Sequence, residues 1–327
     1  MSGIDLARRF YEESVRPLLG DRPHAAALLG AGSEVLGFDD EVSTDHDFGP
    51  RVQIFLPPGT PELVADDRVE VTTTAGFFVA RLGVDPAAGF GLEDWLVTPT
   101  QTLAELTAGA VFHDPAGELA RRRAALAWYP DDVWRYVLAA GWLRVAQEEA
   151  FVARAGSTGD DLGSRVVAGR LVRELMRLAF LVERRWAPYP KWLGAAFARL
   201  ALAADAAPML AEALAAPGWR AREAALVAAA SRIATATNEL GLAEPVDPAP
   251  RPYYTRDIRV LGADRFVVAL TTAIRDPAVG ALLERHGGRR GGPVPALPGT
   301  IDQVTDSTDV LTCPARCRAT ALLLGAG

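Results

Sequence analysis

The spacing of hydrophobic residues changes character along this chain. In the first part, residues 52–56 form a short apolar run and residues 68–74 alternate apolar with polar positions, so both segments predict β-strands. Residues 5–19 instead repeat apolar positions at helical spacing and predict an amphipathic helix. The first part of the chain is therefore expected to combine a small sheet with helices.

Beyond residue 130 the apolar positions recur at the three- and four-residue intervals of long helices. Asp131 or Asp132 is expected to cap the first of these helices, and Ser164 is expected to cap a helix over residues 165–186. Further helices are predicted over residues 193–216, 219–240, 263–274 and 277–285.

These patterns predict an α+β protein with two domains. The chain has 327 residues, 50% of them hydrophobic, which is enough for two hydrophobic cores. We expect a small sheet-containing domain over residues 1–120 and a larger helical-bundle domain over residues 121–327.

Charge and cysteine content restrict the possible partners and compartment. The net charge of −7 argues against a broad nucleic-acid surface, which would be basic, so no stable nucleic-acid binding is expected. No stretch approaches eighteen uninterrupted apolar residues, and the charged segment 1–15 lacks a signal-peptide core, so we expect a cytoplasmic protein without membrane partners. Cys313 and Cys317 have no nearby histidine, which favours reduced thiols over a zinc site.

The candidate chemistry is concentrated in the segment LGAGSEVLGFDDEVSTDHDFG, residues 29–49. Asp45 and Asp47 precede the predicted strand 52–56 and are expected to lie on a strand themselves, with both carboxylates on one face and His46 on the other. Two convergent carboxylates favour a divalent cation. The backbone amides at Gly32 and the hydroxyl of Ser33 could bind phosphate.

This arrangement resembles the nucleotidyltransferase superfamily, which has the polymerase-β-like fold. The sequence also resembles a bacterial family described only as a domain of unknown function with that fold. The resemblance lies in residues 32–51, in PYPKW (188–192) and in TIDQVTDST (300–308). The resemblance implies a small mixed-sheet nucleotidyltransferase-like domain. It also implies Mg²⁺ (or Mn²⁺) held by Asp45 and Asp47, with an NTP as substrate.

The resemblance implies a third carboxylate on a later strand, and Glu70 is the best candidate. Its apolar neighbours alternate with it as a strand requires. The alternative is a solvent-facing strand glutamate with no role in the site. His46 stands where the superfamily has an apolar residue, and it is expected to pack or donate a hydrogen bond more readily than act as a base.

Five basic residues and a late polar segment are further candidates. Arg51 and Arg173 could bind phosphate, although Arg170, Arg173 and Arg177 also fit a solvated helix face balanced by glutamates. Lys191 could neutralise phosphate in a cleft between the domains, or it could anchor the bundle through a cation–π contact with Trp192. In the late segment, Asp302, Gln303 and Asp306 could hydrogen-bond an acceptor, or Asp306 could cap a helix.

The leading hypothesis is a Mg²⁺-dependent enzyme that transfers a nucleoside monophosphate from an NTP to a small-molecule hydroxyl or amine. Asp45, Asp47 and Glu70 are its predicted metal ligands, and Gly32, Ser33, Arg51 and Arg173 are its predicted nucleotide-binding residues. One alternative is a catalytically degenerate nucleotide-binding protein that regulates a partner. Another is an accessory protein that acts on a protein acceptor.

Overall fold

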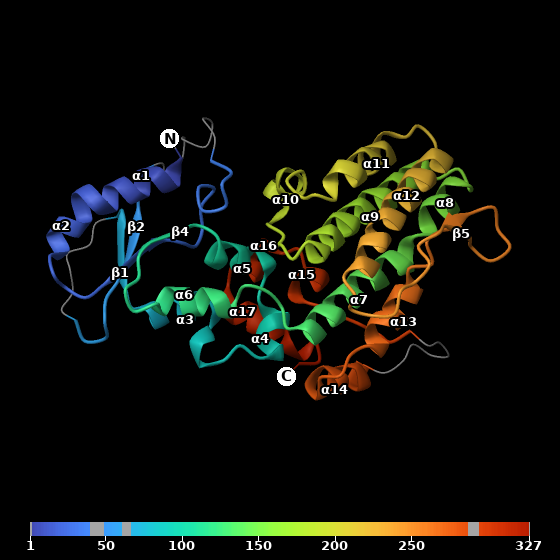
Figure 1. Cartoon of the computed structure of the whole chain (residues 1–327). Helices are drawn as coiled ribbons and strands as arrows, with labels where there is room; N and C mark the ends of the chain where they lie inside the picture. Colours follow the sequence, from blue (N-terminus) through green and yellow to red (C-terminus); the bar gives the residue numbers. More distant parts are fainter. Residues whose placement is uncertain (1, 40–48, 61–66, 287–293, 327) are drawn as a thin grey trace. The chain divides into compact units, whose positions relative to one another are not determined.

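A mixed β-sheet organises the first part of the chain in the computed structural model, which describes residues 2–39, 49–60, 67–286 and 294–326 (Figure 1). Its strand order is β3-β2-β1-β4, and β1 runs antiparallel to β2 and β4 whereas β3 runs parallel to β2. The strands are β1 (Ala25–Leu28), β2 (Val52–Phe55), β3 (Val69–Thr72) and β4 (Ala110–His113). The predicted strands near residues 52–56 and 68–74 and the α+β class are confirmed.

One face of this sheet is covered by the first helical segment. That segment consists of α1 (Gly3–Phe10), a π-helical turn (Tyr11–Val15) and α2 (Arg16–Leu19), so the helix predicted over residues 5–19 is confirmed. Tyr11 and Val15 from the helical segment and Val52 and Ile54 from β2 belong to one buried cluster. Alternation along β2 therefore turns Val52 and Ile54 toward this helical layer.

The intervening residues of β2, Gln53 and Phe55, share the opposite face of the strand. Helix α3 (Thr74–Leu82) packs there, with the Phe77 ring 5.3 Å from the Phe55 ring in an edge-to-face contact. Glu70 on β3 is the register partner of Gln53, so both side chains point to the α3 side of the sheet. This face carries the candidate site.

The described residues form two compact units. Unit 1 comprises residues 1–128 and 307–319, and unit 2 comprises residues 129–306 and 320–327. The other helices of unit 1 are a 3₁₀ turn (Pro86–Ala88), α4 (Leu92–Val97), α5 (Thr100–Thr107), α6 (Glu118–Ala125), α16 (Thr308–Leu311) and α17 (Pro314–Ala319). The boundary expected at 120/121 falls inside α6, and whether the two units are independent domains stays a prediction.

Unit 2 is almost entirely helical. Its elements are α7 (Asp131–Glu148), α8 (Phe151–Gly156), α9 (Asp161–Val182), α10 (Pro190–Phe197), α11 (Ala203–Ala215), α12 (Trp219–Glu239), the short strands β5 (Arg251–Pro252) and β6 (Arg259–Val260), α13 (Asp264–Thr272), α14 (Pro277–His286), α15 (Ile301–Val304) and a 3₁₀ turn (Thr320–Leu322). The helices predicted over residues 219–240, 263–274 and 277–285 are confirmed. Among the described residues, no helix combines the length and the apolar character needed to cross a membrane.

The single helix predicted over residues 193–216 is wrong, because the chain breaks between α10 and α11. Glu183, just beyond α9, supplies the physical reason. Its carboxylate accepts hydrogen bonds from the backbone N–H groups of Ala201 (3.0 Å) and Leu202 (2.6 Å). These donors at the start of α11 are thereby satisfied by a tertiary contact that alanine-rich sequence does not reveal.

Two predicted helix caps are also wrong. Asp160 caps α9 by accepting from the Gly163 N–H at 2.7 Å, whereas Ser164 is buried inside the helix and accepts from Arg222. Helix α7 begins after Pro130, and the Asp132 carboxylate accepts backbone N–H groups elsewhere in unit 2, including that of Arg275 at 2.8 Å. Both side chains serve tertiary contacts instead of their own helix ends.

Candidate functional site

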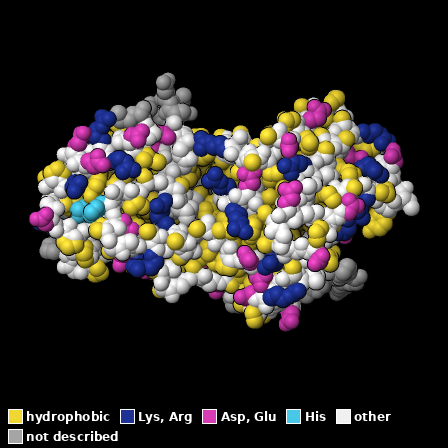
Figure 2. All heavy atoms as spheres, in the orientation of Figure 1, with side chains coloured by type: hydrophobic (Ala, Val, Ile, Leu, Met, Phe, Trp, Pro, Cys, Tyr) yellow, Lys and Arg dark blue, Asp and Glu magenta, His cyan; other side chains and the backbone are white. Residues whose placement is uncertain are grey.

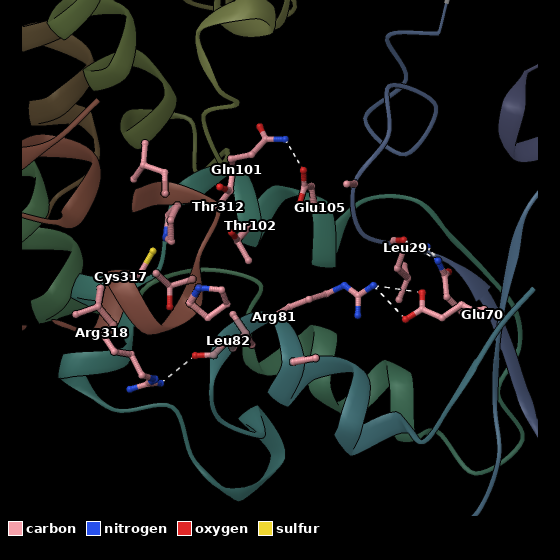
Figure 3. Close-up of a pocket in the computed structure, with 18 of the residues that line it drawn as sticks. Leu29, Glu70, Arg81, Leu82, Gln101, Thr102, Glu105, Thr312, Cys317 and Arg318 are labelled. Carbon is pink, nitrogen blue, oxygen red and sulfur yellow. Dashed lines mark hydrogen bonds and ion pairs between the residues drawn. The ribbon is translucent and has the colours of Figure 1, made fainter. Parts of the chain in front are cut away.

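A pocket of about 340 Å³ opens in unit 1 on the α3 side of the sheet (Figure 3). Its walls come from the end of β1, from β2 and β3, from helices α3 and α5, and from the returning segment 307–319. The charged and amide side chains among its lining residues are Arg51, Gln53, Glu70, Arg81, Gln101, Glu105 and Arg318.

The end of β1 is held in place by the buried side chain of Gln53. Its amide oxygen accepts from the Leu29 N–H at 2.9 Å, and its amide nitrogen donates to the Leu29 carbonyl at 3.1 Å. The next residue, Gly30, donates its N–H to the Glu105 carbonyl of α5 at 2.9 Å. The backbone that enters the Gly32-Ser33 turn is therefore fixed from both β2 and α5.

The turn itself brings Arg51 against the backbone. Gly32 has φ +143°, a conformation that favours glycine, and a Cβ there would lie 2.6 Å from the Glu34 carboxylate oxygens. Arg51 forms an ion pair with Glu34 at 2.6 Å and also donates to the Ala31 carbonyl. The structure thus brings together Gly32 and Arg51, two of the predicted phosphate-binding residues.

Glu70 enters the same pocket from β3. Both of its carboxylate oxygens lie 3.2 Å from Nη2 of Arg81, which extends toward them from α3 in Figure 3. Arg81 also lies over the Phe77 ring, with its guanidinium carbon 3.6 Å from the centroid. The Glu70 side chain is 43% exposed, so its carboxylate is accessible within the pocket, and its metal-binding role stays a prediction.

Glu105 is a second pocket carboxylate, and sequence reasoning missed it. Its carboxylate accepts a hydrogen bond from the Gln101 amide at 2.7 Å, one helical turn earlier on α5. Burial raises the pKa of Glu105, while the Gln101 hydrogen bond and the charges of Arg81 and Arg51 lower it in part. The group is therefore a carboxyl whose charged form is poorly solvated.

The returning segment 307–319 supplies the wall that bears Thr312, Cys317 and Arg318 (Figure 3). Arg318 donates to the Leu82 carbonyl at 3.0 Å and to the Asp94 carboxylate at 2.7 Å, which fixes α17 to the ends of α3 and α4. Cys317 is buried, and neither it nor Cys313 forms a disulfide.

The remaining metal-site candidates cannot be placed beside Glu70. Asp45 and Asp47, with the neighbouring His46, lie outside the described residues. Among the residues that the structure does describe, no three His, Cys, Asp or Glu side chains form a group that could hold a metal ion. The Glu70 carboxylate is a hard oxygen group of the kind Mg²⁺ prefers, and its role as a metal ligand stays a prediction, as do those of Asp45 and Asp47.

Comparison with known sequences connects the pocket with a family of proteins. Residues 95–193 match the sequence model of a family described as Domain of unknown function (DUF4037). No curated protein matches the chain. The DUF4037 match supports the expected likeness to a family of unknown function, and the nucleotidyltransferase relationship stays a prediction.

The DUF4037 match begins in α4 and includes Gln101 and Glu105 of the pocket. It continues through α9 and the PYPKW segment of unit 2. The Gly32-Ser33 turn and Glu70 precede the matched residues. The match thus covers the α5 wall of the pocket but not the strands that carry the predicted metal site.

Two predicted site residues of unit 2 fall within the DUF4037 match. Lys191 lies with its ammonium nitrogen 4.7 Å from the Trp192 ring centroid, the cation–π contact expected as its alternative role. Arg173 forms an ion pair with Asp306 and lies 4.0 Å from Glu174. The catalytic role of Lys191 and the nucleotide-binding role of Arg173 stay predictions.

The late TIDQVTDST segment forms hydrogen bonds inside unit 2. Thr300 and Gln303 form a capping box at the start of α15, and the buried Gln303 also donates to the Val137 carbonyl at 3.4 Å. Asp306 pairs with Arg173, whereas the residue that caps α16 is Ser307. The suggestion that Asp306 caps a helix is therefore wrong.

Proposed function

We propose that this chain is a Mg²⁺-dependent nucleotidyltransferase that moves a nucleoside monophosphate from an NTP to a small-molecule hydroxyl or amine. The observation that carries the proposal is that Glu70 and Arg51 line one pocket together with Ala31, the residue before Gly32, and that Arg51 lies against Gly32. A carboxylate beside cationic and backbone phosphate-binding groups is the arrangement that this chemistry requires.

In this reaction the acceptor oxygen or nitrogen attacks the α-phosphorus and its proton passes to water. The bond to the β-phosphate breaks, and pyrophosphate leaves with the electron pair of that bond. Mg²⁺, when bound, supplies positive charge to the triphosphate oxygens. Asp45, Asp47 and Glu70 would hold the ion, and the Gly32-Ser33 turn would position the β- and γ-phosphates. Arg51 and Arg81 line the same pocket and would offset the charge that develops on the leaving pyrophosphate.

The donor set fits a magnesium ion, because every proposed ligand is a carboxylate. Glu70 is engaged by Arg81 alone among the described residues, through one guanidinium nitrogen at 3.2 Å. An exposed ion pair of this kind contributes roughly 0–1 kcal/mol, so a divalent ion can displace the arginine. The freed Arg81 would then be available to a phosphate.

The test is pyrophosphate release from each NTP by the purified chain, with Mg²⁺ and a metabolite extract as the source of acceptor. Wild type is expected to release pyrophosphate, and both Asp47→Asn and Glu70→Gln are expected to abolish release. Asp131→Asn, at an exposed aspartate in the first turn of α7, is the matched control and should behave as wild type. Release that is unchanged in both site variants would contradict the proposal.

A second candidate function is a catalytically degenerate protein that binds nucleotide and regulates a partner. Two ion pairs favour this second function: Glu70 is paired with Arg81, and Arg51 is paired with Glu34. Both proposed functional groups, Glu70 and Arg51, therefore already have partners. Nucleotide binding without pyrophosphate release, under the conditions above, would support this second function.

A further inference from the structure

The charged side chains that line the pocket do not all have an ion-pair partner among the described residues. Arg51 is paired with Glu34 at 2.6 Å, Arg81 with Glu70 at 3.2 Å, and Arg318 with Asp94 at 2.7 Å. Glu105 differs, because no Arg, Lys or His of the described chain lies within ion-pair distance of its carboxylate. The pocket therefore contains one carboxylate that no cation of the described residues contacts directly, although the charges of Arg81 and Arg51 act on it from farther away.

This carboxylate is poorly solvated as well as without a direct ion-pair partner in the described part of the chain. Burial raises the pKa of Glu105, and its described hydrogen bond comes from the neutral Gln101 amide. A buried carboxylate is stabilised most by a cation that reaches it directly. A ligand that brings an ammonium group into the pocket would provide that cation.

The surrounding wall suits a small organic amine. Val97 and Pro99 line the same pocket as Glu105 with apolar side chains. Thr98 and Thr102 add hydroxyl-bearing side chains, of which the Thr98 hydroxyl donates to the Asp94 carbonyl at 2.6 Å. A volume of about 340 Å³ lies at the lower end of the range for small-molecule sites. Figure 3 shows Thr102, Gln101 and Glu105 on α5, apart from the Arg81–Glu70 pair.

We propose that Glu105 binds a protonated primary amine of the acceptor, so that the acceptor class is a small cationic amino compound. The inference deepens the proposed function and rests on it for the identity of the ligand as an acceptor. Gln101 orients the Glu105 carboxylate, and the Thr98 and Thr102 side chains contact the polar atoms of the acceptor beside its ammonium group.

The binding test uses two probes of matched size, 1,4-diaminobutane and 1,4-butanediol, titrated calorimetrically into the full chain without nucleotide. Wild type is expected to bind the diamine at least tenfold more tightly than the diol. Glu105→Gln should weaken diamine binding at least tenfold, because it keeps the shape and removes the charge. Glu13→Gln, at an exposed glutamate of the π-helical turn, should leave diamine binding unchanged.

Glu105→Gln is expected to fold, because an amide resembles the neutral carboxyl that burial favours. Equal diamine affinity in wild type and Glu105→Gln would overturn the inference, as would equal binding of diol and diamine or no binding of diamine at millimolar concentration. A thermal melt of the variant separates loss of binding from loss of fold.

A second experiment tests the amine site separately from the proposed transferase function. Pyrophosphate release is measured with an NTP, Mg²⁺ and pooled amino or neutral hydroxyl compounds as acceptors. Glu105-dependent diamine binding without release from either pool contradicts the transferase and leaves the amine site supported. Release with neutral hydroxyl compounds alone supports the transferase and overturns the amine site.

Discussion

Nη2 of Arg81 lies 3.2 Å from both carboxylate oxygens of Glu70, joining helix α3 to strand β3 across the pocket. The two side chains are 29% and 43% exposed, so the pair contributes little to the stability of the fold. In the structure Arg81 neutralises Glu70, and under the proposed function Arg81 would release Glu70 to a metal and bind phosphate instead.

Arg81→Met is expected to weaken binding of a Mg²⁺-nucleotide complex about tenfold, since it removes a charge-assisted contact worth about 1.4 kcal/mol. Affinity is measured by calorimetric titration. Arg121→Met is the control, because Arg121 is 60% exposed on α6 and pairs only with nearby Glu118 among the described residues. Equal loss in both variants would point to general electrostatic attraction instead.

Glu70→Gln is expected to leave nucleotide affinity within about threefold and to reduce turnover at least a hundredfold, since its charge acts mainly in the transition state. Nucleotide titration and single-turnover pyrophosphate release are measured on the same preparation. Undiminished turnover would show that another carboxylate completes the site.

Gly32→Ala is expected to lower the free energy of unfolding by about 1–3 kcal/mol, because alanine is strained at φ +143° and its Cβ would meet the Glu34 carboxylate. Denaturant unfolding measures the change. Gly169→Ala, inside α9 with open space around its Cβ, should instead stabilise unit 2 by roughly 0.5–1 kcal/mol. The contrast tests the turn geometry independently of any activity.

Glu149 predicts a pH dependence of stability in unit 2. Its carboxylate accepts the N–H groups of Leu261, Gly262 and Ala263 at the start of α13, and burial raises its pKa from 4.5 to about 7. Between pH 4.5 and about pH 7, Glu149 is protonated in the folded chain and ionised in the unfolded chain. The free energy of unfolding should therefore fall as pH rises, by up to about 3 kcal/mol over that window.

The comparison that isolates this effect is between wild type and Glu149→Gln, unfolded with denaturant at pH 4.5, 5.5, 6.5 and 7.5. The glutamine side chain does not titrate in this pH range, so only wild type loses stability through this group as pH rises. The difference in unfolding free energy between the two proteins should therefore shrink or reverse. A difference that is constant with pH would contradict the raised pKa.

Most helices and strands could be predicted from the spacing of apolar residues along the sequence. An element buried on one face repeats its apolar residues at the period of a strand or of a helix. The strand around Gln53 and the helix of Tyr11 and Val15 are examples. The break between α10 and α11 was missed because the groups that satisfy it belong to Glu183, distant in sequence. The predicted caps are wrong for the same reason, since Ser164 accepts from Arg222 of α12 and Asp132 accepts from Arg275 in the loop between α13 and α14.

The candidate site was only partly accessible to sequence reasoning. Arg51 and Glu70 were both candidates from the sequence, Glu70 because of its strand context, and both line the pocket. Arg81 and Glu105 lie on helices without a motif, and they reach the site only because α3 and α5 pack against the sheet. The four-residue interval between Gln101 and Glu105 was the one local signal, and such pairs are common on exposed helices.

The return of residues 307–319 to unit 1 has a consequence for the order of events during synthesis. The strands and α3 are made early, yet Thr312, Cys317 and Arg318 leave the ribosome only after all of unit 2 up to Asp306. A nascent chain can therefore fold the sheet but has an open-sided pocket until residues 307–319 have been made. Ligand binding should accordingly become possible only after residues 129–306 have been synthesised, which delays any activity until most of the helical unit is also present.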